Sequence, residues 1–156
     1  MNGIYHKIGI RAGASDVIKA LTTKAGLAGW WTTEVEGPFS NGASGVGESI
    51  HFGFEQKGAF DMKVQKVAPE RVTWECTSGP DEWIGSHIDF DLKSAKTSDG
   101  AAMTVVYFRH QDWKNENEFT AHCSTKWAIF LLSLRDLIEV GRGQPAPQDI
   151  KIDEFN

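Results

Sequence analysis

The segment at residues 118–142 constrains the fold more than any other feature, because it has the pattern of one long amphipathic helix. Its apolar side chains recur at spacings of three and four, which places them on one helical face; they are Phe119, Cys123, Trp127, Phe130, Leu131, Leu134, Leu137 and Ile138. A helix of this length makes about seven turns, and its apolar face must be covered. The only cover of sufficient size is a sheet predicted over residues 46–110.

Alternating apolar and polar residues predict that this sheet is antiparallel and curved. A strand at residues 4–10 precedes two short helices near 15–21 and 23–29. The following chain has the pattern of a β-meander, with alternating runs at residues 50–54, 60–64, 72–76, 84–92 and 104–110. Single-faced alternation indicates that one side of the sheet is covered and the other faces water. We therefore expect an α+β fold in which one strand, two short helices and a six-strand meander wrap around a long C-terminal helix.

Bulk composition restricts the class of protein further. The 156 residues include 40% hydrophobic and 24% charged residues, and a single domain over 1–143 with a C-terminal tail at 144–156 is expected. The sequence contains no apolar run of 18 residues, so no membrane span is predicted. The N-terminus lacks the pattern of a secretory signal. The net charge of −5, with scattered basic residues, argues against nonspecific nucleic-acid binding. Cys76 and Cys123 lack metal or redox spacing, which favours a reducing, cytoplasmic location.

Four stretches of sequence resemble one known family. They are VIKALTTKAGLAGWWT at 17–32, KVAPERVTWEC at 66–76, IDFDL at 88–92, and the long helix with Trp127 followed by Leu131 and Leu134. Together they resemble the homologues of the activator of the heat-shock chaperone ATPase (AHSA-type). These belong to the START-related, birch-pollen-allergen-like (SRPBCC) superfamily. The likeness spans roughly residues 4–142.

This resemblance implies the helix-grip fold more firmly than it implies a function. Members of the superfamily bind hydrophobic ligands, carry lipids, or act as cyclases and aromatases. The chain departs from the family in two respects. Lys126 stands where the family often has glycine before the tryptophan, and the additional domain of the chaperone activators proper has no counterpart here.

The inward-facing side chains of sheet and helix are the candidate ligand-binding residues. They comprise Phe52, Phe54, Phe60, Met62, Trp74, Ile88, Phe90, Phe108, Trp127, Phe130, Leu131 and Leu134, with Trp31, His110 and His122 at the rim or mouth. Pockets for small molecules are mostly apolar, with a few polar groups that orient the ligand. The same residues are also compatible with a solid core, since large aromatic side chains pack densely. The sequence leaves both arrangements open.

Several local features carry more specific expectations. Trp30 and Trp31 are adjacent, so on a strand one would face the core and the other the pocket mouth. The glycine-rich residues 40–47 are a candidate flap over the cavity. Asp89 and Asp91 fall on the predicted outer face and are expected to be solvated. Residues 144–156 lack periodicity and are expected to be mobile or to lie on the surface.

The leading functional hypothesis is a cytoplasmic, noncatalytic protein that binds a small hydrophobic, lipid-like or aromatic molecule. One alternative is a cyclase or hydrolase that uses His110 or His122 as acid–base; neutral imidazole near its ordinary pKa suits this role. Another is a chaperone ATPase-activating cofactor. No catalytic residues, metal site or cofactor are predicted, because no known motif for them is present. The apolar outer face of the long helix, with Ala128, Ile129 and Leu132, makes a homodimer a reasonable hypothesis.

Overall fold

One seven-stranded antiparallel sheet and three α-helices form the protein in the computed structural model, which describes residues 3–154 except for the side chain of Gln56. The strands are β1 (Gly3–Ile10), β2 (Glu34–Glu36), β3 (Ser49–Gly53), β4 (Ala59–Ala68), β5 (Arg71–Ser78), β6 (His87–Lys96) and β7 (Ala102–Gln111). The helices are α1 (Ala14–Thr22), α2 (Lys24–Trp30) and α3 (Glu118–Val140), with a short 3-10 turn, η1 (Glu55–Lys57). The strand order is β1-β7-β6-β5-β4-β3-β2, so β2 to β7 form the predicted six-strand meander.

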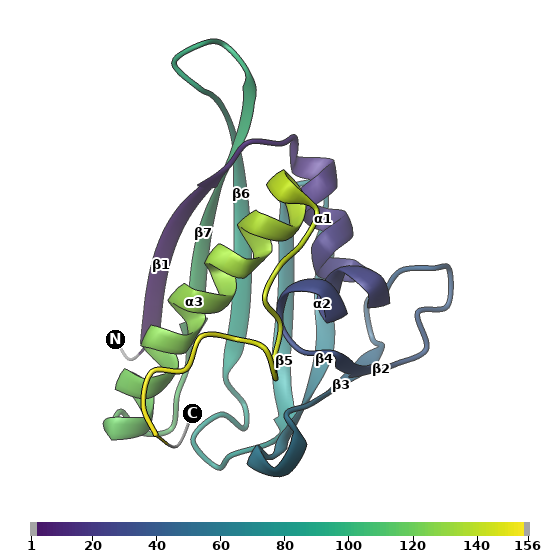
Figure 1. The fold of residues 1–156 in the computed structure, drawn as a ribbon. Helices are drawn as coiled ribbons and strands as arrows, with labels where there is room; N and C mark the ends of the chain where they lie inside the picture. Colours follow the sequence, from purple (N-terminus) through teal and green to yellow (C-terminus); the bar gives the residue numbers. More distant parts are fainter. Residues whose placement is uncertain (1–2, 155–156) are drawn as a thin grey trace.

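Helix α3 lies across one face of the sheet, with α1 and α2 beside it on the same face (Figure 1). Asn117 caps its N-terminus by accepting a hydrogen bond from the Phe119 N–H at 2.9 Å, and Gly141 ends it in the left-handed conformation. The two caps set where the helix begins and ends. The predicted helix-grip architecture is therefore confirmed.

The core fills the space between the sheet and the helices. Its strand contribution comes from alternate residues, as the period of a β-strand requires: Thr104, Val106, Phe108 and His110 of β7 are all buried. Opposite them, α3 buries Trp127, Leu131 and Leu134. Trp30 anchors α2 to α1, because its indole N–H donates to the Ala20 carbonyl at 3.0 Å.

Two predictions about β6 are wrong. The strand begins at His87 and not at Ile84, because the chain turns at Gly85, whose φ is +86°. This turn directs Trp83 into the molecule, where it is buried. Asp89 lies on the outer face as expected, but it is only 1% exposed. Arg71 and Arg109 cover its carboxylate with hydrogen bonds, of which the Arg109 bond measures 2.9 Å.

The C-terminal segment is anchored to the domain. The Ala146 N–H donates to the Trp31 carbonyl at 2.8 Å, and the Thr33 N–H donates to the Ala146 carbonyl at 3.0 Å. Gly143 packs so closely on Gly29 that a Cβ at this position would lie 2.5 Å from the Gly29 carbonyl oxygen. After α3 the chain thus returns beside α2 and crosses in front of α3 (Figure 1). Within residues 3–154, no helix is long and apolar enough to cross a membrane.

Candidate ligand-binding pocket

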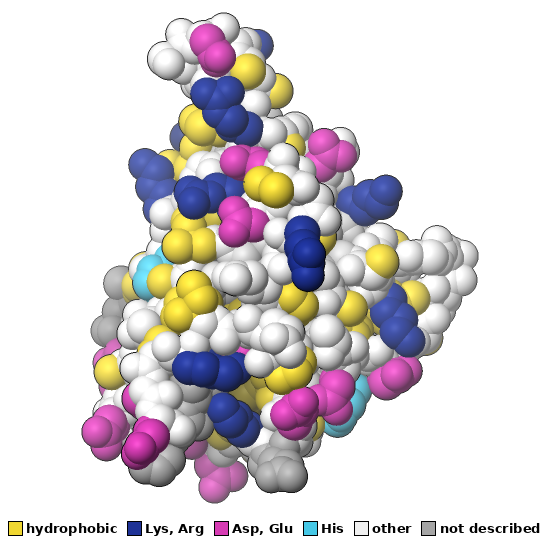
Figure 2. All heavy atoms as spheres, viewed as in Figure 1, with side chains coloured by type: hydrophobic (Ala, Val, Ile, Leu, Met, Phe, Trp, Pro, Cys, Tyr) yellow, Lys and Arg dark blue, Asp and Glu magenta, His cyan; other side chains and the backbone are white. Residues whose placement is uncertain are grey.

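A pocket of about 510 Å³ opens at one end of the interface between sheet and helix. Its walls come from the end of α2, η1, the start of β4, the β5–β6 turn, the first half of α3 and the C-terminal segment. Figure 2 shows hydrophobic side chains at the base of this hollow in the lower part of the visible face. Known small-molecule pockets range from about 300 to 1,000 Å³, so the space suits a small organic ligand.

Aromatic side chains make most of the apolar wall; they are Trp31, Phe54, Phe60, Trp83, Phe119, Trp127 and Phe130. Trp31 separates the pocket from the closed core. Its ring stacks on Trp74 in the core at 5.9 Å between centroids and tilts against Trp127 at 5.1 Å. Both tryptophans are about 2% exposed, so the wall is already packed in place. A ligand would therefore meet a preformed surface.

The positions of Trp30 and Trp31 follow from helical geometry and not from a strand. Trp30 is the last residue of α2 and Trp31 is its C-cap with helical backbone angles. Their rings are stacked, with centroids 5.8 Å apart and an interplanar angle of 11°. Trp30 lies in the core and Trp31 lines the pocket. Trp31 thus forms an inner wall of the pocket and does not lie at its mouth, and the predicted strand arrangement of the two tryptophans is wrong.

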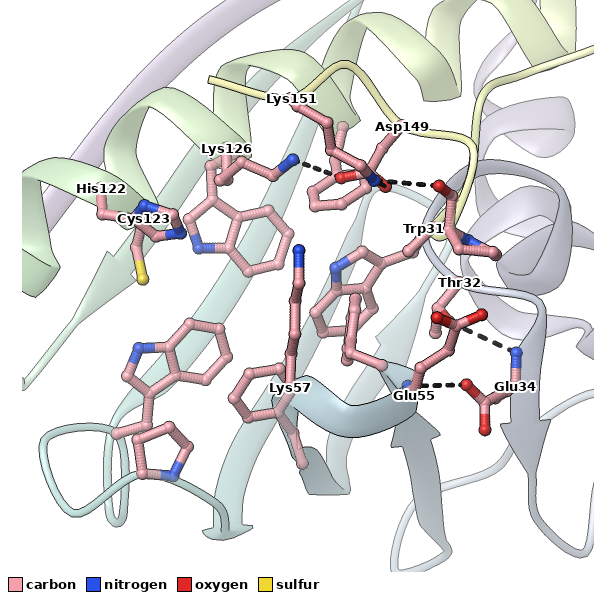
Figure 3. A pocket seen from close by; sticks show the side chains of 18 of the residues that line it. Trp31, Thr32, Glu34, Glu55, Lys57, His122, Cys123, Lys126, Asp149 and Lys151 are labelled. Carbon is pink, nitrogen blue, oxygen red and sulfur yellow. Dashed lines mark hydrogen bonds and ion pairs between the residues drawn. The ribbon is translucent and has the colours of Figure 1, made fainter. Parts of the chain in front are cut away.

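Polar groups gather on two sides of the pocket. Lys126 and Asp149 form a buried ion pair, and Lys151 contacts the same carboxylate at 2.7 Å (Figure 3). Burial opposes the charged form of Asp149, but hydrogen bonds from Lys126 and Lys151 prevail and its pKa lies below the usual range. On the other side, the Glu34 carboxylate accepts a hydrogen bond from the Glu55 N–H at 2.8 Å.

His110 is part of the core and does not line the pocket. Its Nδ1 accepts a hydrogen bond from the Trp127 indole at 3.1 Å, and its Nε2 lies 2.8 Å from the Ser86 hydroxyl. Burial, with a smaller contribution from the charge of His87, lowers its pKa to about 3. The ring is therefore neutral at physiological pH and locked as one tautomer, which is a structural role.

His122 does line the pocket, from the first half of α3. Its ring is stacked on Phe119, with centroids 6.0 Å apart. Cys123 beside it is 5% exposed, and burial raises the pKa of its thiol to about 12. Among residues 3–154, neither residue has a hydrogen bond to a charged partner of the kind that activates a nucleophile. Within the described residues no group of three or more His, Cys, Asp or Glu side chains converges as metal ligands would.

The structure separates the predicted ligand-binding residues into two groups. Six of them line the pocket, namely Trp31, Phe54, Phe60, His122, Trp127 and Phe130. The other nine lie in the closed core, namely Phe52, Met62, Trp74, Ile88, Phe90, Phe108, His110, Leu131 and Leu134. The sequence left open whether these residues line a ligand pocket or form a solid core. Both arrangements are present, in different parts of one interface.

Sequence reasoning missed the turn, the tail and most of the polar lining; the added residues include Thr32, Glu34, Glu55, Lys57, Pro80, Trp83, Lys126, Ala146, Pro147, Asp149 and Lys151. Phe119 and Cys123 were detectable from the helical stripe. The predicted flap at residues 40–47 is wrong, because none of these residues lines the pocket. The loop is held elsewhere, with the Ser44 N–H donating to the Thr22 carbonyl at 2.7 Å.

Comparison with known proteins agrees with this architecture. No protein-family model matches the chain, and no curated protein matches it. Among solved structures, the Aha1 dimer from Colwellia psychrerythraea is 40% identical, covering 92% of this chain and 100% of that one with a TM-score of 0.78. Protein MLL2253 from Mesorhizobium loti (17% identity, TM-score 0.70) covers 89% of this chain and 98% of its own. DynU16, a putative protein of the dynemicin biosynthetic locus (17% identity, TM-score 0.66), covers 92% of this chain and 49% of its own.

The two distant structures establish the fold alone, which is the helix-grip fold. The Colwellia protein is similar enough in sequence to show the family as well. The chain belongs to the Aha1-type (AHSA) family.

Proposed function

We propose that this protein binds a small hydrophobic or aromatic molecule in the pocket between η1, α3 and the C-terminal segment. The observation that carries the proposal is an open space of about 510 Å³ walled mainly by aromatic side chains. Burying apolar ligand surface there is favourable by about 25 cal/mol per Å² removed from water. Because Trp31 and Trp127 are held by core contacts, little side-chain ordering opposes binding.

A noncatalytic role fits the chemistry of the lining. The pocket's histidine and cysteine lack an activating partner among the described residues, and His110 is neutral and enclosed in the core. Apolar contact is therefore the main attraction that the described lining offers a neutral ligand, which distinguishes this role from the acid–base alternative.

The test is a fluorescence titration with N-phenyl-1-naphthylamine, a neutral aromatic dye that brightens in apolar surroundings. Cys123→Trp places a large side chain in the pocket from α3 and should weaken dye binding at least tenfold. Ala121→Trp, an exposed site on the same helix, is the matched control and should bind as the parent does. Loss of binding in both variants, or in neither, would contradict the proposal, provided that circular dichroism shows both to be folded.

Family membership favours one competing function, that of a chaperone ATPase-activating cofactor. Such a role requires a protein-binding surface and not an open pocket. A coupled ATPase assay with the cognate heat-shock chaperone separates the two. Stimulation that survives Cys123→Trp would favour the cofactor role, whereas the absence of stimulation with dye binding intact would favour the ligand-binding role.

We also infer that the protein is a homodimer located in the cytoplasm. The Colwellia relative was solved as a dimer, and Leu132 on the outer face of α3 is 41% exposed beside the half-buried Ile129. Both cysteines are buried free thiols, which suits a reducing compartment. Light scattering of the parent and of Leu132→Glu tests the dimer, because a charge at the contact should shift the mass to that of a monomer. A parent that is already monomeric would refute it.

A further inference from the structure

Three lysines converge on the pocket from elements far apart in the sequence. Lys126 comes from α3, Lys57 from η1 and Lys151 from the C-terminal segment, and all three line the pocket (Figure 3). We call these three residues the lysine cluster. Lys126 is the buried member, with 8% of its side chain exposed, whereas Lys151 is 45% exposed.

The lysine cluster carries more charge than the carboxylates beside it neutralise. Asp149 contacts both Lys126 and Lys151, so one negative charge serves two ammonium groups. Their remaining hydrogen bonds go to uncharged carbonyl oxygens, of Ile150 from Lys126 and of Pro147 from Lys151, each at 2.9 Å. Lys57 has no ion-pair partner among the residues that the structure describes. The cluster thus has three ammonium groups, and within the described part of the chain the one carboxylate that contacts them is that of Asp149.

The charges of Lys57 and Lys151 act on the buried Lys126 across the pocket. Burial lowers the pKa of Lys126, and repulsion from Lys151 and Lys57 lowers it further, whereas Asp149 opposes the shift. Lys57 is therefore close enough for its charge to be felt at the buried lysine. A second negative charge placed among these groups would relieve this repulsion.

The acidic residues of the pocket lie on a separate edge. Glu34 and Glu55 are next to each other at the β2 side, where the Glu34 carboxylate accepts the Glu55 N–H. Figure 2 shows the hollow with Lys and Arg side chains on one side and Asp and Glu side chains on the other. An amphipathic molecule with one charged end would be oriented by this difference.

We propose that the ligand is an amphipathic anion, with an aromatic or aliphatic body against Trp31 and Trp127 and its acidic group at the lysine cluster. The inference rests on the proposed ligand-binding function and specifies the chemical class of ligand. The acidic group accepts hydrogen bonds from Lys57 and Lys151, which are the two members with accessible ammonium groups. Hydrogen bonds between charged groups are stronger than neutral ones. Lys126 with Asp149 holds the pocket wall and the tail in place.

The experiment compares two dyes that share one aromatic body. N-phenyl-1-naphthylamine is neutral, and 8-anilinonaphthalene-1-sulfonate adds a single sulfonate to the same ring system. We expect the sulfonate to bind the parent protein about tenfold more tightly than the neutral dye, as one favourable charged contact provides. Cys123→Trp should weaken both dyes, which places both in the pocket.

Variants then assign the preference to the lysine cluster. Lys57→Gln/Lys151→Gln removes two positive charges and the Lys151 contact with Asp149, while Lys126 still neutralises that carboxylate. The double variant should abolish the preference for the sulfonate while neutral-dye binding persists. Lys63→Gln/Lys66→Gln, two exposed lysines of β4, is matched in net charge and should retain the preference.

The outcomes are distinguishable. Equal affinity for the two dyes in the parent, or a preference that survives Lys57→Gln/Lys151→Gln, overturns the anion proposal and leaves the binding function standing. If the neutral dye does not bind the parent at all, the proposed binding function fails and the anion proposal fails with it.

Discussion

The interface between sheet and helix has two regions that are both lined by aromatic side chains. One region is filled, and the other contains an open pocket. In the closed region, Trp74, Phe52 and Phe90 are each 0% exposed, and Trp30 of α2 packs edge-on against Phe90 with 6.1 Å between ring centroids. In the open region, Phe54, Phe60 and other rings surround a space of about 510 Å³. Aromatic content therefore does not decide whether such an interface is filled. The two regions differ in their surroundings, because the open region borders η1, the β5–β6 turn and the C-terminal segment.

The first prediction concerns a substitution in the closed region, which should have the largest effect on stability. Trp74→Ala removes a fully buried indole and should lower the free energy of unfolding by about 3–5 kcal/mol. Phe54→Ala, at the half-buried pocket wall, should cost about 1–2 kcal/mol, because its site already borders open space. Urea denaturation measures both.

Trp74→Phe is the control for this pair. The Trp74 N–H has no hydrogen-bond partner among the described residues, so its loss should be nearly free and the variant should stay within about 1.5 kcal/mol of the parent. Equal costs for Trp74→Ala and Phe54→Ala would show that the two regions are equally packed.

The second prediction concerns the tail that closes the open region. Asp149→Asn leaves the buried Lys126 ammonium without its carboxylate and should cost about 3 kcal/mol. The effect should be local, because the contacts of Gly143 with Gly29 and of Ala146 with Trp31 hold the start of the tail independently of the ion pair. Trypsin should then cleave after Arg142 and Lys151 much faster than in the parent.

The double variant Lys126→Met/Asp149→Asn is the comparison. Removing both partners leaves no unpaired buried charge, so much of the loss should be recovered. A tail that is cleaved equally fast in the parent and in Asp149→Asn would mean that the ion pair does not hold the segment.

The helix, the meander and the closed core were predictable from sequence because periodicity encodes them. Trp127, Leu131 and Leu134 repeat on one helical face, and Phe90 and Phe108 alternate along their strands. The placement of these side chains depends only on local geometry. The same reasoning found the pocket walls contributed by the helix.

The rest of the pocket depends on contacts that no local pattern records. Trp83 enters through a turn whose sequence is polar, and it does so because Gly85 adopts a positive φ. The outward parity of Asp89 was correctly predicted, but its burial results from two arginines on neighbouring strands. The role of Lys126 depends on Asp149, 23 residues away in a segment without periodicity.

The third prediction concerns the pH dependence of stability that His110 gives to the closed region. The pKa of His110 is lowered from 6.5 to about 3 by burial, so the unfolded chain binds a proton below pH 6.5 that the folded chain does not. Stability is therefore complete above pH 6.5 and should fall by about 1.4 kcal/mol per pH unit between pH 6 and pH 4. Asp89 and Asp149, with pKa values below 3.8, contribute only under more acidic conditions.

His110→Gln should flatten this slope, whereas His51→Gln, at an exposed histidine, should keep it. Urea titrations at several pH values measure the slope directly. An unchanged slope in His110→Gln would exclude this residue as the group responsible.

The smallest effect compares one cysteine in each region. Burial raises the pKa of Cys76 to about 11 and that of Cys123 to about 12, so at pH 8 only roughly one thiol in a thousand or fewer is the reactive thiolate. Both should be alkylated slowly by iodoacetamide. Cys123 lines the pocket and Cys76 does not, so saturation with N-phenyl-1-naphthylamine should slow modification at Cys123 alone. Peptide mass spectrometry assigns each site. Equal protection of both cysteines would indicate that the dye stabilises the whole fold without occupying the open region.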